Sequence, residues 1–358
     1  MQRRHFISGS AACLLTAGIT ALARSEGRST LDHRVIACEE HFTISAVEEE
    51  SARRQGPGAR PRAFLNQLLD LGGGRMQAMD AAGVDVQLLS LATPGVQNFD
   101  PPTAQALARE ANDQLAQAVR DHPERFAGLA CFPPQSPNAA AQELARAHSE
   151  LGLVGGVVHS HTAGEYLDDT KFWAIFEAAE ALEMPIYLHP RDPADTLAGP
   201  ALRVPGFRVG WVFGVETATH ALRLIAGGVF DRFPGLQIVL GHMGETLPFA
   251  LPRIDDRFAF ERERSGLSHL EATPGEYFRR NFLFTTSGLN HWPQLQTTIA
   301  MVGVERILFA VDYPFEDSAT AVEAIRDMPL APSQRRAICE DNAMRWFGLK
   351  SADGVRPS

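Results

Sequence analysis

Residues 35–42 read Val35-Ile36-Ala37-Cys38-Glu39-Glu40-His41-Phe42, an apolar, β-branched run that ends in acidic and imidazole side chains. The apolar half is typical of a buried strand. Successive side chains of a strand alternate between its two faces, so Glu39 and His41 point to the same side. The strand is therefore expected to end with a carboxylate and an imidazole side by side, as two metal ligands would.

Seven further short apolar runs follow, at residues 84–90, 126–131, 154–158, 186–189, 238–240, 282–285 and 307–310. Segments with a helical period, such as 66–82 and 102–121, lie between them. Apolar runs that alternate with helices predict a parallel sheet covered on its faces. Eight such units over about 300 residues favour an α/β fold of the (β/α)8 TIM-barrel type over an open doubly wound sheet.

One domain accounts for residues 35–350, because no linker, composition shift or internal repeat divides them. Residues 51–62 are rich in Arg, Pro and Gly and are predicted to form a loop. Residues 191–214 follow the fifth predicted strand and contain several Pro and Gly residues. We expect this second segment to be an extended βα loop that helps to shape the active site.

The N-terminus has the pattern of a bacterial export signal. Arg3-Arg4-His5-Phe6-Ile7 carries a twin arginine, the apolar stretch 11–23 follows, and Ala21-Leu22-Ala23 offers a cleavage site. Residues 1–23 are therefore predicted to direct export to the periplasm and to be removed. The apolar stretch is shorter than the roughly 20 residues that a membrane span needs, so no stable membrane anchor is expected.

Composition excludes some partners. The formal net charge is −10 and no basic run is present, so nucleic acid is not an expected partner. Cleavage of the signal would leave Cys38, Cys131 and Cys339, which are far apart and in apolar surroundings. These three cysteines are better interpreted as small buried hydrophobic residues than as a disulfide framework.

Polar side chains recur where the predicted strands end. Besides Glu39 and His41, they are His189, His242, Glu245 and Asp312. The carboxyl ends of barrel strands meet on one face, where the active sites of this fold lie. A single histidine at a strand end is more often structural, but four strands that bring carboxylates and imidazoles to one face predict a metal site.

Five segments resemble the amidohydrolase superfamily, and within it the branch of γ-resorcylate (2,6-dihydroxybenzoate) and aminocarboxymuconate semialdehyde decarboxylases. They are Cys38-Glu39-Glu40-His41-Phe42, Leu188-His189-Pro190-Arg191, Leu240-Gly241-His242-Met243-Gly244-Glu245, Asp312-Tyr313-Pro314-Phe315-Glu316 and Asp341-Asn342-Ala343-Met344-Arg345-Trp346-Phe347. Other members of the superfamily begin with His-x-His. The Glu-x-His of this chain is similar to the γ-resorcylate type.

The resemblance implies a role for each matching residue. The metal ligands would be Glu39, His41, His189 and Asp312. A polar pair beside the metal would be His242 and Glu245, and the substrate pocket would be lined by Arg253 and Phe315. The ion would be a single Zn²⁺ or Mn²⁺, and a set of two carboxylates and two imidazoles suits either.

The scarcity of lysine supports a mononuclear site. Binuclear relatives often bridge two metals with a carboxylated lysine after strand 4, but this chain has no lysine near Val158. His159 and His161 stand there instead. Their position does not match a ligand of the family, so pocket polarity or loop structure is the preferred interpretation.

The resemblance implies a metal-dependent decarboxylase that acts on a small aromatic or unsaturated carboxylic acid, such as an ortho-hydroxybenzoate. Asp312 would donate a proton to the ring carbon, with His242 and Glu245 orienting it or relaying the proton. A metal-dependent hydrolase of a lactone, amide or C–C bond remains an alternative, with Asp312 as general base. A third alternative is a metal-stabilised binding protein without catalysis. The resemblance also implies a homodimer or homotetramer.

Overall fold

The computed structural model describes residues 31–55, 60–194 and 205–349. Every element described below belongs to one compact unit of the chain, which begins at His33. The predicted export signal, residues 1–23, lies outside the described residues.

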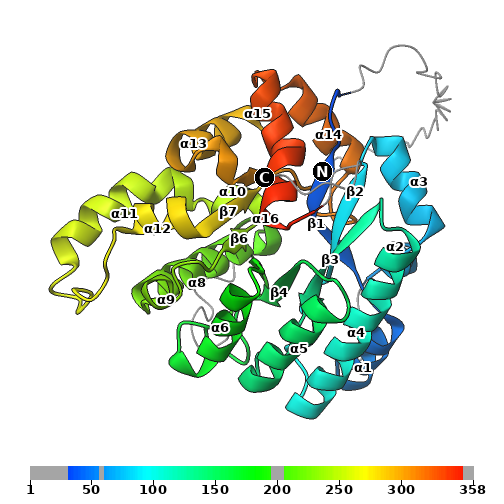
Figure 1. Cartoon of the computed structure of the whole chain (residues 1–358), viewed down its shortest axis with the longest axis horizontal. Coiled ribbons are helices and arrows are strands. Elements are labelled where there is room, and N and C mark those ends of the chain that lie inside the picture. Colours follow the sequence, from blue (N-terminus) through cyan, green and yellow to red (C-terminus); the bar gives the residue numbers. More distant parts are fainter. Residues whose placement is uncertain (1–30, 56–59, 195–204, 350–358) are drawn as a thin grey trace, which may run out of the picture. The chain divides into compact units, whose positions relative to one another are not determined.

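Eight parallel strands form one sheet in the order of the sequence (Figure 1). They are β1 (Ile36–Phe42), β2 (Val86–Leu91), β3 (Phe126–Cys131), β4 (Gly155–His159), β5 (Ile186–His189), β6 (Ile238–Leu240), β7 (Phe282–Thr285) and β8 (Ile307–Leu308). Each coincides with or overlaps a predicted apolar run. The described strand residues are buried throughout, as expected for a parallel sheet that is covered by helices.

Hydrogen bonds between β1 and the segment after β8 close the sheet. The Cys38 amide donates to the Phe309 carbonyl at 2.9 Å, and the Asp312 amide donates to the Glu39 carbonyl at 2.8 Å. An isolated parallel bridge joins Glu40 to Tyr313. The predicted α/β fold, a (β/α)8 barrel, is confirmed.

Helices lie between successive strands and cover the barrel (Figure 1). The longer ones are α1 (Ser45–Gln55), α2 (Arg62–Leu69), α3 (Gly73–Ala82), α4 (Pro101–Asp121), α5 (Pro137–Ser149), α6 (Trp173–Ala181), α8 (Gly214–Ala226), α11 (Leu247–Glu261), α12 (Pro274–Asn281), α13 (Trp292–Val302) and α14 (Ser318–Asp327). The shorter ones are α9 (Val229–Arg232), α10 (His242–Glu245), α15 (Pro332–Arg336), α16 (Asn342–Trp346), η1 (Thr170–Phe172), η2 (Arg208–Phe213), η3 (Val304–Arg306) and η4 (Ala337–Asp341).

Two local predictions were wrong in detail. The predicted loop 51–62 begins inside α1, whose glutamates and arginines favour a helix; Glu50 and Arg54, four residues apart, form an ion pair at 2.7 Å. The predicted single helix 66–82 is two helices, α2 and α3. The Asp70 carboxylate accepts the amides of Gly72 and Arg75, and this local bonding ends one helix and starts the next.

The predicted βα loop 191–214 is only partly described, because residues 195–204 lie outside the described part. Its last residues are not loop: they form the π-helical turn η2, which runs directly into α8.

A buried arginine fixes α2 and α3 against β1. Arg75 is fully buried and donates to the His41 carbonyl at 2.6 Å and to the Gln67 carbonyl at 3.1 Å. It also donates to the Gln87 side chain, which in turn donates to the Glu40 carboxylate at 3.1 Å. The backbone of one candidate metal ligand is therefore tied to the helix that precedes β2.

Two further findings concern the described residues. None of the helices there has the length and apolar character needed to cross a membrane. Cys38, Cys131 and Cys339 are free and buried, as predicted.

Candidate metal centre

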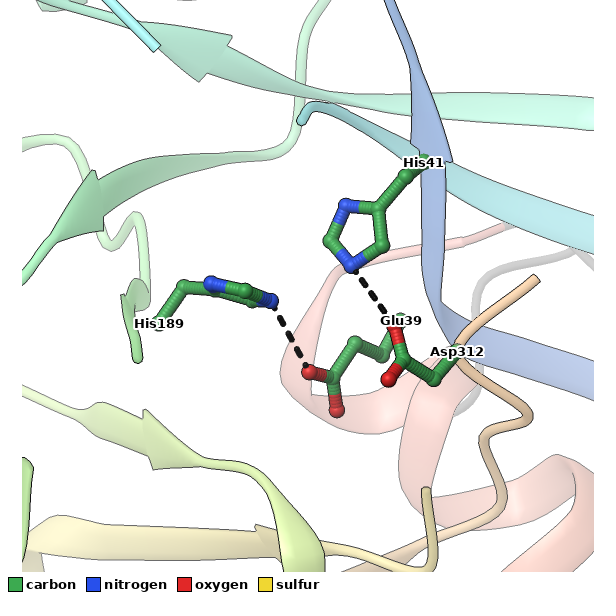
Figure 2. Close-up of side chains that lie close together, drawn as sticks. All are labelled: Glu39, His41, His189 and Asp312. Carbon is green, nitrogen blue, oxygen red and sulfur yellow. Dashed lines mark ion pairs between the residues drawn. The ribbon is translucent and has the colours of Figure 1, made fainter. Parts of the chain in front are cut away.

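Four predicted ligands come together at the carboxyl ends of the strands. Glu39 and His41 come from β1, His189 ends β5, and Asp312 follows β8. One donor atom from each lies within 4.8 Å of the other three. Figure 2 shows their side chains directed toward one another from three separate parts of the barrel.

The hydrogen bonding of His189 leaves one ring nitrogen free for a metal. Its Nδ1 lies 2.8 Å from the Pro190 carbonyl, which can only accept, so Nδ1 carries the proton. Burial and the neighbouring His41 lower the pKa of His189 to about 4, so the ring is neutral near pH 7. Its bare Nε2 therefore points a lone pair toward Glu39 Oε1, 3.4 Å away.

The second imidazole has a similar arrangement. His41 Nδ1 lies 3.1 Å from the Ser90 hydroxyl, and His41 Nε2 lies 3.1 Å from Asp312 Oδ1. When Nδ1 donates to Ser90, Nε2 and the carboxylate oxygen face each other as two electron pairs. A cation between them would turn this repulsion into two bonds.

Hydroxyl groups fix the carboxylate of Glu39 from behind. Its Oε2 accepts hydrogen bonds from Tyr187, from Thr285 at 2.9 Å and from Ser287. The other oxygen, Oε1, is buried without a hydrogen-bond partner. One oxygen is thus held by the protein while the other remains available to an ion.

These residues fit a divalent cation. Glu39 Oε1, His41 Nε2 and His189 Nε2 are buried and have no hydrogen-bond partner in the part of the chain that is described. Unpartnered buried polar atoms are rare because each costs about 1–3 kcal/mol. Their convergence with the Asp312 carboxylate makes these four residues a candidate site for one divalent cation, and a set of two carboxylates and two imidazoles suits Zn²⁺ or Mn²⁺.

The predicted His242–Glu245 pair forms on an unusual turn. His242 Nδ1 and Glu245 Oε1 are 2.8 Å apart. The element α10 is not a right-handed helix: all residues from 242 to 246 have positive φ, between 49° and 76°. Only Gly244 among them adopts this conformation without strain, so this turn stores backbone strain beside the cluster.

This turn places the protonated imidazole of His242 near Asp312. Burial alone would lower the pKa of His242, but the carboxylates of Glu245, Glu39 and Asp312 outweigh it and raise the pKa well above its usual value. Burial would raise the pKa of Asp312, but the neighbouring His242 and His41 hold it well below its usual range. The proton of this pair therefore resides on His242, with Nε2 3.7 Å from Asp312 Oδ2.

One of the two predicted pocket residues lies at the cluster. The Phe315 ring is 5.6 Å from the His41 ring and 5.0 Å from that of Phe64 on α2, yet Phe315 remains 41% exposed. An exposed aromatic side chain thus stands beside a predicted metal ligand. Arg253 is exposed on α11, and the described residues give it no bond to the four ligands; its pocket role stays a prediction.

The two histidines after strand 4 have different surroundings. His161 accepts the Gly164 amide at Nδ1 and lies 2.9 Å from the Asp192 carbonyl through Nε2, which joins two loops. His159 is buried with its ring 5.1 Å from that of His189. Neither belongs to the four-ligand cluster.

The sequence reasoning missed the hydroxyl groups around Glu39. Tyr187 stands two residues before His189, and Ser287 stands two residues after Thr285. The period of two that places Glu39 and His41 on one face applies equally to these pairs. Applied to β5 and β7, it would have marked Tyr187 and Thr285 as inward-facing.

Comparison with known proteins gives independent evidence for the family of this chain. Residues 38–349 match the family described as amidohydrolase. The chain is 37% identical to γ-resorcylate decarboxylase of Polaromonas sp. strain JS666, covering 88% of this chain and 98% of that protein.

Solved structures agree with this match. The 5-carboxyvanillate decarboxylase of Sphingomonas paucimobilis superposes with a TM-score of 0.85 at 41% identity, covering 88% of this chain and 99% of the other. A dihydroxybenzoic acid decarboxylase from Polaromonas sp. JS666, with bound manganese and the inhibitor 2-nitroresorcinol, superposes at 0.81 and 37% identity, covering 90% and 99%.

The first prediction concerns the ligands. Metal-loaded protein should hold close to one divalent ion per chain, and His189→Ala should lose most of it, because a neutral imidazole with a free Nε2 is removed. Elemental analysis after gel filtration measures the content. His148→Ala, at an exposed position on α5, serves as the control and should keep its ion. Full occupancy in His189→Ala would exclude His189 as a ligand.

A second prediction concerns His242. His242→Asn should keep the ion but lose turnover by about 10²–10⁴-fold, the usual contribution of a positioned acid. Because the pKa of His242 is raised, the ring is protonated at neutral pH, and wild-type turnover should fall as pH rises through that pKa. The variant should lack this fall. The same substitution at exposed His148 on α5 is the control. Near-normal turnover of His242→Asn would make the residue structural.

Proposed function

We propose that this chain, which belongs to the amidohydrolase family, is a metal-dependent, non-oxidative decarboxylase of hydroxybenzoates. The observation that carries the proposal is the four-ligand cluster with a proton-holding His242 beside it. Relatives that cover nearly the same length are named as decarboxylases of hydroxylated aromatic acids.

The chemistry explains why such a site needs both a metal and an acid. Direct loss of CO₂ from a ring would leave a carbanion in the ring plane, outside the π system. Protonation of the ring carbon first avoids this carbanion, and loss of CO₂ then restores aromaticity. An ortho-hydroxyl group supplies electron density for the protonation. The bound metal would hold the oxygens of the acid and favour their anionic form.

The chain's own residues supply the proton. His242 holds it on the imidazole, and Glu245 stabilises that charge at 2.8 Å. Asp312 lies between His242 and the other ligands and can pass the proton on from its carboxylate. This resolves the difficulty that a metal-bound aspartate is a weak proton source: Asp312 needs to carry the proton only briefly.

The shape of the site supports a planar substrate. The Phe315 ring stands next to His41 and packs against the Phe64 ring, and together the two rings offer an apolar surface beside the proposed metal site. Aromatic faces of this kind favour ring substrates through stacked or edge-on contacts. Phe315 was expected in this role, and Phe64 joins it from α2.

Manganese is the ion that we propose. The ligand set contains oxygen and nitrogen donors and no thiolate, which suits Mn²⁺ as well as Zn²⁺. A solved relative at 37% identity holds manganese.

The third prediction tests the reaction. Manganese-loaded protein should release CO₂ from an ortho-hydroxybenzoate, faster than zinc-loaded protein, and product made in D₂O should carry deuterium at the vacated ring carbon. The label is expected because the exchangeable proton of His242 and Asp312 is the one delivered. Asp312→Asn should abolish turnover, since an amide neither carries that proton nor binds metal as an anion. Gas analysis and NMR measure both results.

A contrary result is easily recognised. If a hydroxybenzoate panel yields no CO₂ while a lactone or amide panel is hydrolysed with incorporation of water, the chain is a hydrolase and the decarboxylase proposal fails.

We also propose export to the periplasm, on the strength of Arg3-Arg4 and the apolar stretch that follows. In bacterial cells the full chain should appear in the periplasmic extract, and the double variant Arg3→Lys, Arg4→Lys should stay in the cytoplasm. Immunoblots of the two fractions measure this, with a cytoplasmic marker as control. Equal distribution of both proteins would contradict export by this signal.

A homodimer or homotetramer is proposed as the assembled form. Large apolar side chains are exposed on η2 and α11, namely Val209, Trp211, Phe249 and Phe260. Exposed apolar side chains in such numbers suggest a surface that a second copy covers. Light scattering should give a multiple of the 39.0 kDa chain mass, and Phe249→Asp should shift it toward the monomer. A monomeric wild type at micromolar concentration would exclude the proposal.

A further inference from the structure

One buried imidazole next to the metal ligands has no role so far. His159 is the last residue of β4 and pairs in register with His189 of β5, as Val157 pairs with Tyr187. Register partners on parallel strands point to the same face. Since Tyr187 and His189 point into the barrel, His159 does too, and it lies in the same layer as a metal ligand.

The loop after β2 is built to seat this ring. A Cβ on Gly95, which has a φ of 59°, would lie 2.7 Å from His159 Nδ1, so a side chain at 95 would displace the imidazole. Gln97 accepts the His159 amide at 2.6 Å and donates to the His159 carbonyl at 3.0 Å. These contacts hold both the ring and the backbone of His159 in one place.

The two ring nitrogens of His159 differ. The Leu91 carbonyl accepts a hydrogen bond from the ring, and Nδ1 is the nitrogen on the side of Gly95 and the β2 end. Nε2 has no hydrogen-bond partner, although His159 is only 1% exposed. In the neutral ring Nε2 is therefore a free acceptor. The same condition, a buried and unpartnered Nε2, holds for His41 and His189.

We propose that His159 is a substrate-binding residue, whose Nε2 accepts a hydrogen bond from a ring hydroxyl group of the aromatic acid bound at the metal. The inference rests on the proposed function and deepens it, because it names a residue that selects hydroxylated rings. His159 is outside the four-ligand cluster, so its free nitrogen is available to the substrate and is not needed by the ion.

The chemistry of the acceptor sets the specificity. A lone pair in a buried site accepts from a hydroxyl group, but finds no donor in a methoxy group or a hydrogen atom at the same ring position. An analogue without the hydroxyl would leave Nε2 unpartnered in the complex, and sites built to bond a substrate hydroxyl reject such analogues.

Binding of two phenols to the manganese-loaded full chain tests this without turnover. The probes are 2-nitroresorcinol and 2-nitrophenol, which differ by one hydroxyl group flanking the nitro group. Two variants distinguish the contribution of Nε2 from that of Nδ1. His159→Gln places an amide oxygen near the Nε2 position, whereas His159→Asn keeps a polar group only near Nδ1. Calorimetric dissociation constants and the metal content of each protein are the readouts.

Wild type should prefer 2-nitroresorcinol by about tenfold, as one good hydrogen bond predicts. His159→Gln should keep most of that preference, and His159→Asn should lose it, with the ion retained in both. The inference is overturned if the preference is unchanged in His159→Asn, if both variants behave alike, if either loses its ion, or if wild type binds neither phenol. Absence of CO₂ release with the predicted binding pattern would refute the proposed function alone.

Discussion

The pairing of β1 with the segment after β8 is the constraint on which both the barrel and its site depend. The Asp312 amide donates to the Glu39 carbonyl at 2.8 Å, so the bond that closes the sheet also holds two predicted ligands together. Glu40 on the same strand accepts the Val311 amide at 3.0 Å. Because consecutive residues of β1 serve opposite faces, one short segment seals the barrel and supplies ligands to its interior.

Behind β1, a buried polar network supports the ligands. Burial raises the pKa of Glu40 well above its usual value, while the Val311 amide and Arg75 oppose the rise. Arg75 reaches the His41 carbonyl and α2 together, so the metal ligand and the aromatic wall of Phe64 share one anchor. Removing one member of a buried charge network commonly costs about 3–5 kcal/mol, because the others lose their partner. The buried network of Arg75 and Glu40, which lies outside the site, thus holds the predicted ligand and the aromatic side chain in place.

In the proposed site, different residues bind the ion and hold the proton. Three atoms that face the site, Glu39 Oε1, His41 Nε2 and His189 Nε2, are buried and have no hydrogen-bond partner among the described residues. The other oxygen of Glu39 is held by hydroxyl groups. The proton is held at the partly exposed His242, on a left-handed turn whose strain the surrounding packing must sustain. A site of this kind is suited to bind an ion on one side and to hold an acid on the other.

The sequence by itself determined the barrel and the meeting of Glu39, His41, His189 and Asp312 on one face, because strand period and strand-end polarity are local properties that a parallel sheet converts into one face. It also placed His242 beside Glu245. Only the tertiary structure showed that Tyr187, Thr285 and Ser287 hold one oxygen of Glu39, since these contacts join residues more than a hundred positions apart. The split of residues 66–82 into two helices, the aromatic wall and the inward His159 likewise depend on which chain segments meet in space, and that information is absent from any single local pattern.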